Sequence, residues 1–230
     1  MSSASLSRLS GIVLLVGGLL SFVSAAVLDV QFPGRNATPQ QILSLPWILE
    51  TSLILVGVLL ISLGFPGFYL RQSAQAGKLG FAGFVLLWVA VLLSELSFTA
   101  LQITIFPWLS QTDPKLLGSG AEPFAAALLF VFGPTLLFIV GSILLGIATM
   151  RSRVFGRGPG IALLALGIIG VISVLLISVP LPSTADNIVN TLFDVSVFLA
   201  FAWCGYATVA RKVEPMTAPS MAIPSAQASR

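Results

Sequence analysis

The sequence predicts an all-α bundle that crosses a membrane six times, and three observations support that prediction. Of the 230 residues, 57% are hydrophobic and only 8% are charged, whereas an ordinary soluble domain has roughly 25% charged residues. The apolar residues form six runs, each close to or above the about 20 residues that a spanning helix needs. The few basic residues lie between these runs. Lipid is therefore the expected solvent around this protein.

The six predicted spans belong to one transmembrane domain, residues 1–210. They cover residues 11–30, 43–70, 79–108, 123–150, 160–181 and 188–210. The remaining residues, 211–230, are rich in Pro, Ala and Ser, a composition that predicts a flexible tail.

The first span has two interpretations. Arg8, a short apolar run and Val23-Ser24-Ala25 together resemble a cleavable signal peptide. A small residue at every seventh position, Gly11, Gly18 and Ala25, favours instead a permanent helix that packs closely against another. We expect the permanent helix.

Basic residues give the predicted orientation. With six alternating spans, only Arg35 and Lys115 of the 11 basic residues lie on one side. Basic residues gather on the cytoplasmic side of membrane proteins, so both termini are expected in the cytoplasm, with the protein in a plasma membrane such as a bacterial inner membrane. Aromatic residues should then mark the interfaces, with Trp47 and Trp108 outside and Tyr69 and Tyr206 inside.

Composition also argues against several functions. Histidine is absent and Cys204 is the single cysteine, which removes the commonest metal ligand, the commonest acid-base catalyst and any disulfide framework. Nucleotide-binding and hydrolase motifs are also missing. We therefore expect no metal, no cofactor and no enzymatic activity. The net charge of +3 reflects orientation rather than nucleic-acid binding.

Three acids inside the apolar spans, Glu50, Glu95 and Asp194, are the candidate site residues. An ionisable side chain is costly in lipid and is a functional hypothesis by default. Glu95 lies near the middle of its span, and Thr99 and Gln102 follow at helical spacing, so the three should share one face. Glu95 is expected to be a neutral acid that ionises when a cation or water enters. The alternative is a hydrogen bond between helices that locks the bundle.

The other two acids lie nearer the outer ends of their spans. Asp194 shares its face with Asn190 and forms a polar wedge in the sixth span. Glu50 shares its face with Gly57 and Gly64, seven and fourteen residues later, and so lies above a groove where another helix can approach closely. The alternative is an interfacial carboxylate that hydrates upward past Trp47. The three acids together predict an acidic vestibule open to the outside.

Gly133 and Pro134 are the candidate hinge in the fourth predicted span. Proline removes a backbone hydrogen bond, and this can bend a helix or free a carbonyl group toward a cavity. A passive kink is the alternative, since proline is common in membrane helices.

These features lead to two functional hypotheses. The first is a small transporter or channel-like protein with a protonatable carboxyl site, whose partners are the lipid bilayer and a proton or small cation. The second is a non-catalytic accessory subunit or sensor whose small-residue faces bind a second copy or a partner membrane protein. The acids would lie around one cavity in the first and at separate helix contacts in the second.

Overall fold

A computed structural model of the protein describes residues 3–31, 37–116, 132–177 and 183–210, and every regular element within these ranges is helical. In chain order the elements are α1 (Ser3–Gln31), α2 (Pro39–Ile42), α3 (Leu45–Val91), the π-helix η1 (Leu92–Leu96), α4 (Ser97–Thr112), the 3₁₀ helix η2 (Pro114–Leu116), α6 (Gly133–Ser152), α7 (Gly158–Ile177) and α8 (Ser183–Ala210).

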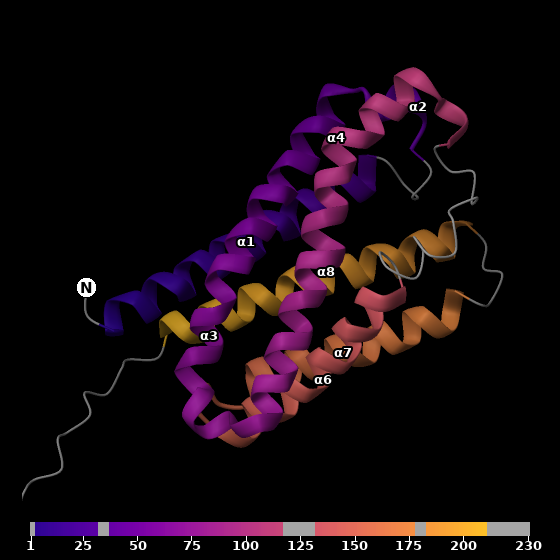
Figure 1. Ribbon diagram of the computed structural model, residues 1–230. Coiled ribbons are helices and arrows are strands. Elements are labelled where there is room, and N and C mark those ends of the chain that lie inside the picture. The colour runs from indigo at the N-terminus through magenta and orange to yellow at the C-terminus, as the bar shows by residue number, and fades with distance from the viewer. Residues whose placement is uncertain (1–2, 32–36, 117–131, 178–182, 211–230) are drawn as a thin grey trace, which may run out of the picture.

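Helix α3 is a hairpin of two arms, residues 45–76 and 78–91. Gly77 joins them with non-helical backbone angles, φ 59° and ψ −163°, and the chain reverses direction there (Figure 1). The indole Nε1 of Trp88 donates a hydrogen bond to the carbonyl oxygen of Ser62 at 3.2 Å. A straight helix would separate these two residues by about 39 Å, so the hydrogen bond requires the hairpin.

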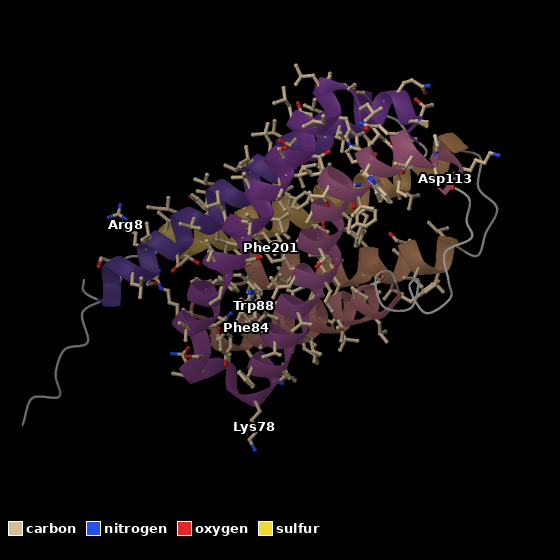
Figure 2. The ribbon with its side chains drawn as sticks, turned by 45° about the horizontal axis from the view of Figure 1, so that its top comes forward. Arg8, Lys78, Phe84, Trp88, Asp113 and Phe201 are labelled. Atoms are coloured by element: carbon tan, nitrogen blue, oxygen red, sulfur yellow. The ribbon has the colours of Figure 1, made fainter. Side chains whose placement is uncertain are left out.

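The helices form one bundle whose two ends differ. Helix α1 packs against α3 and α8, and α6 packs against α3 and α7. The start of α1, the Gly77 turn, the connection from α6 to α7 and the end of α8 lie toward one end of the bundle, and α2 and the end of α4 lie toward the other (Figure 1). Arg8 and Lys78 mark the first end and Asp113 marks the second (Figure 2). We call the first the basic end.

Five stretches of the described chain are long and apolar enough to cross a membrane. They are Ser5–Leu28, Leu45–Thr112, Gly133–Ser152, Gly158–Leu176 and Thr191–Ala210. The second stretch has 68 residues and contains the Gly77 reversal, so it includes both the second and the third predicted spans. These lengths and compositions are those of a membrane protein.

The helix ends differ from the predicted boundaries. The second predicted span stops at residue 70, but the first arm of α3 continues to residue 76, because neither glycine nor proline occurs between residue 70 and Gly77. Helix α8 begins at Ser183 rather than at residue 188. Residues 123–131 of the fourth predicted span and the tail 211–230 lie outside the described residues.

The predicted packing of small residues is confirmed. A Cβ atom added to Gly57 would lie 2.9 Å from the carbonyl oxygen of Gly17, and one added to Gly64 would lie 2.6 Å from the backbone nitrogen of Leu14. Gly18 is equally close to Ala202 of α8. Backbones approach this closely only where side chains are absent, so these glycines hold α1 against α3 and α8.

Only two of the four residues of the predicted aromatic belts are exposed on the bundle surface. Trp108 and Tyr206 are more than half exposed. Trp47 is buried, and Tyr69 is buried with its ring stacked on Phe84 at 4.5 Å, because the hairpin brings the second arm of α3 against that ring. The level of all four residues in a membrane stays a prediction.

Candidate functional site

Glu95 lies in a π-helical turn, the feature that sets it apart from the other candidate acids. The backbone N–H of Ser97 donates to the carbonyl oxygen of Leu92 five residues earlier, and the Ser97 hydroxyl donates to the same oxygen at 2.8 Å. A π-turn holds one more residue than an α-turn and occurs frequently at functional sites. The Glu95 side chain is half-buried.

The extra residue changes which side chains face inward on α4. Phe84, Leu87 and Val91 of the preceding arm are buried at α-helical spacing. If the α-helix continued without interruption, Phe98 would lie on the same face and be buried. Instead Phe98 is 43% exposed and Thr99 is 4% exposed. The π-turn therefore turns a hydroxyl group into the bundle in place of a phenyl ring.

Thr99 begins a polar face on α4. Gln102, one turn later, is half-buried, and Ser110, eleven residues after Thr99, is 6% exposed. The predicted pairing of Thr99 with Gln102 on one face agrees with this arrangement. Ser110 was not among the predicted site residues, although its spacing from Thr99 places it on the same face.

The start of α6 lies beside η1. Gly141 of α6 packs on Leu87 and Leu145 packs on Gly83, so α6 runs antiparallel to the second arm of α3. Its earlier residues therefore lie toward η1, which contacts α6. Gly133 and Pro134 occupy the first turn of α6, where proline costs no intrahelical hydrogen bond. A hinge needs helix on both sides, and residues 117–131 lie outside the described chain, so the hinge stays a prediction.

The turn of α8 that carries Asp194 lies beside the same part of α6. The ring of Phe193, the residue before it, packs edge-on against Phe138 at 5.8 Å, about one turn beyond Pro134. Asp194 is half-buried, and both it and Glu95 take part in hydrogen-bonding or electrostatic interactions within the protein. The start of α6 is thus close to both the turn that carries Glu95 and the turn that carries Asp194. The side chain of Asn190 lies outside the described part of α8.

The structure does not bring Glu50 into this group. Glu50 is half-buried on the first arm of α3, beside the fully buried Thr51, whose hydroxyl donates to the carbonyl oxygen of Trp47 at 2.7 Å. Among the described residues no hydrogen bond or ion pair joins Glu50 to Glu95 or Asp194. The interfacial interpretation of Glu50 stays a prediction.

An open, mostly apolar depression of about 370 Å³ lies at the end of α1 that is away from the basic end. Its lining residues are Phe22, Val23, Ala26, Val27 and Gln31. None of the candidate acids lines it, so it contributes nothing to the site around η1. No three metal-ligating side chains cluster anywhere in the described ranges.

Sequence reasoning missed a buried polar group at the basic end. The Gln72 side chain is fully buried, and its Oε1 accepts a hydrogen bond at 3.3 Å from the hydroxyl of Ser152 on α6. Thr149, one turn before Ser152, is also fully buried. Gln72 escaped notice because the predicted second span stops at residue 70.

Comparison with protein-family models, with curated proteins and with solved structures finds no match to this chain. The chemistry of the site therefore rests on its own residues: a carboxyl group in a π-turn, a hydroxyl and an amide on the next turns of α4, and a second carboxyl across the start of α6.

Proposed function

We propose that the protein is a small transporter or channel-like protein of a plasma membrane, with Glu95 as its protonatable site. The observation that carries this proposal is the π-turn at Leu92–Leu96. It places a carboxyl group within an apolar helical hairpin and turns Thr99 toward the bundle interior. Such turns occur frequently at functional sites.

The proposed topology has six crossings with both termini in the cytoplasm. A single helix of 68 residues would be about 100 Å long, against a hydrocarbon thickness of about 30 Å. Division at Gly77 gives the stretches 45–76 and 78–112, and each is long enough for one crossing. The basic end carries Arg8, Lys78 and the α6–α7 loop with Arg153 and Arg157, in agreement with a cytoplasmic location.

The chemistry proposed for Glu95 is exchange of its proton for a cation or for water. A carboxyl group at this depth is costly when it is ionised alone, so an incoming charge strongly favours the ionised form. The Thr99 hydroxyl and the Gln102 amide offer further oxygen ligands on the following turns of α4. Asp194, across α6, supplies a second carboxyl group to the same region.

The experiment is a proton-flux measurement in proteoliposomes that contain a pH-sensitive dye. The wild-type protein should dissipate an imposed pH gradient, alone or with a small cation added, and Glu95→Gln should abolish this flux. Asp113→Asn is the matched control, since Asp113 is an exposed acid at the end of α4 and its loss should leave the flux unchanged. Equal flux from the Glu95→Gln variant and the wild type would refute the proposal.

The accessory-subunit hypothesis loses its main support. It relied on small-residue faces that would be free to bind partner helices. Gly18, Gly57 and Gly64 instead pack against helices of the same chain, and Ala25 is buried. A partner helix would have to use other surfaces.

A further inference from the structure

Phe155 lies in a loop at the basic end of the bundle, and its aromatic ring packs onto the helices there. Phe155 belongs to the short connection between α6 and α7, yet its side chain is only 7% exposed. Its ring stacks on Phe68 at 4.7 Å and 14°. The guanidinium carbon of Arg71 lies 5.8 Å from the same ring centroid, within the range of a cation–π interaction. A loop residue is thus held by two residues one turn apart on α3.

Arg71 is fixed on its other side by α8. Its Nη1 donates to the carbonyl oxygen of Thr208. The contact with Phe155 therefore joins the first arm of α3, the α6–α7 loop and the end of α8 at one point.

The loop backbone has positive φ angles on both sides of this ring, and one of them is strained. Arg153 has φ 57° and Gly156 has φ 78°, and a left-handed conformation is unfavourable for a residue with a side chain such as Arg153. The packing of Phe155 holds the strained loop in place. Release of the ring would relieve the strain at Arg153.

Buried polar atoms without partners belong to residues close in the chain to those that make these ring contacts. Gln72 follows Arg71, and the Gln72 Nε2 and the Thr149 Oγ1 are buried with no hydrogen-bond partner among the described residues. Ser152, three residues before Phe155, lies between Gln72 and Thr149: its hydroxyl is within donating distance of the Gln72 Oε1 and of the Thr149 carbonyl oxygen. Buried polar atoms normally have a hydrogen-bond partner in the protein or in bound water. Without water, these residues therefore lack some of their hydrogen bonds.

We propose that Gln72, Thr149 and Ser152 form a water-binding site that opens to the basic end of the bundle when the Phe155 ring leaves its place between Phe68 and Arg71. Water supplies both a donor and acceptors and can complete the hydrogen bonds of the amide and of the hydroxyl groups. The site goes beyond the proposed role of Glu95, and its test does not depend on whether Glu95 carries a proton.

The test is cysteine accessibility in membrane vesicles of both orientations. Thr149→Cys is placed in a Cys204→Ala background and treated with a charged, membrane-impermeant maleimide. Lys78→Cys, at the exposed Gly77 turn, reports which vesicle orientation presents the basic end. Val140→Cys, on the outward face of α6, reports any reaction at lipid-facing positions.

The Thr149→Cys variant should react slowly, and only in the orientation in which Lys78→Cys reacts. Addition of Phe155→Ala should raise its rate at least about tenfold, since both ring contacts are lost. Phe155→Leu keeps an apolar side chain and should give a smaller rise; it replaces the Ala variant if that one does not fold. An unchanged rate in a folded Phe155 variant, or reaction from the opposite side, would overturn the proposal.

Discussion

Glu95 combines an irregular helical turn with an ionisable side chain. The π-turn places its carboxyl group where the helical register changes, so the residues before it pack as an apolar face and Thr99 after it packs as a polar one. A polar face on α4 does not by itself require a π-turn. In an unbroken α-helix, a polar residue at position 98 would place its hydroxyl group on the same face, so a purely structural role would not need the change of register.

The first residue-scale prediction concerns the protonation of Glu95. Infrared titration of the protein in membranes should show the carbonyl band of a neutral carboxylic acid at pH 7 that is missing in Glu95→Gln. The free energy of unfolding of this variant should stay within about 1 kcal/mol of the wild type, since the amide keeps the shape and most hydrogen bonds of the neutral acid. If the substitution instead removes an ionised-carboxylate band at pH 7, Glu95 is not neutral in the resting protein.

Gly57 gives a second residue-scale prediction, about packing. A Cβ atom there would lie 2.9 Å from both the Gly17 carbonyl oxygen and the Ser21 nitrogen, so Gly57→Leu should separate α1 from α3. We expect a loss of about 1–3 kcal/mol, the usual cost of overpacking, seen as a lower unfolding temperature in detergent. Val56→Leu is the control, because Val56 is 47% exposed. Equal stability of the two variants would show that α1 does not pack on this face of α3.

At the scale of elements, the hairpin of α3 depends on one backbone conformation. Gly77 has φ 59° and ψ −163°, a region open almost only to glycine. A Cβ atom at Gly77 would meet nothing within 4 Å, so Gly77→Ala tests the backbone alone. It should cost about 1–3 kcal/mol of unfolding free energy, measured by thermal unfolding, whereas Lys78→Ala at the adjacent exposed position should cost little. A fully stable Gly77→Ala variant would mean that the turn uses a different conformation.

The π-helix η1 is the second element that can be tested by itself. Deletion of Leu93, which is 38% exposed, removes the extra residue and should restore an α-helix in which Thr99 follows Phe84 at α-helical spacing. Thr99 would still face inward and Phe98 outward, so we expect the packing of α4 to be kept while the π-turn around Glu95 and any proton flux are lost. Leu93→Ala keeps the residue count and should retain the flux. A deletion variant with the same flux as Leu93→Ala would show that the π-turn is not needed.

The positions of the helices were largely predictable, and the irregular turns were not. Long apolar runs indicate helices that can cross a membrane, however those helices pack. The seven-residue spacing of Gly57 and Gly64 correctly indicated a helix contact. A single extra residue in a π-turn leaves almost no trace in composition. The prediction that Glu95 and Thr99 share a face assumed one continuous α-helix, and the register change lies at Glu95 itself.

The candidate site was predictable as a set of residues but not as an arrangement. Acids inside apolar runs are visible in any sequence, but which helices lie beside one another is decided by packing. Gly141 lets α6 pack closely on Leu87 of the second arm of α3, and Gly170 of α7 lets Ile139 of α6 and Phe193 of α8 pack closely there. The group at the basic end was not predicted because Gln72, Thr149 and Ser152 come together from positions up to 80 residues apart.

At the scale of the whole molecule, the distribution of charge predicts how the bundle lies in the membrane. Arg8, Lys78 and the basic residues of the α6–α7 loop lie at one end, and Asp113 lies at the other (Figure 2). Moving basic loops across a membrane is disfavoured during insertion, so the basic end should remain in the cytoplasm. With six crossings, Met1 and Arg230 would both be cytoplasmic.

Reporter fusions test this topology directly. A reporter that is active only outside the cytoplasm should be active within residues 31–41 and inactive at Lys78 and after Arg230, and a reporter active only in the cytoplasm should give the opposite pattern. Five crossings would place the tail on the side opposite Met1, so the fusion after Arg230 separates five from six. The fusion at Lys78 tests the hairpin, because a 45–112 segment without the reversal would not return both of its ends to one side. A cytoplasmic signal from residues 31–41 would contradict the orientation, since it would place the basic end outside.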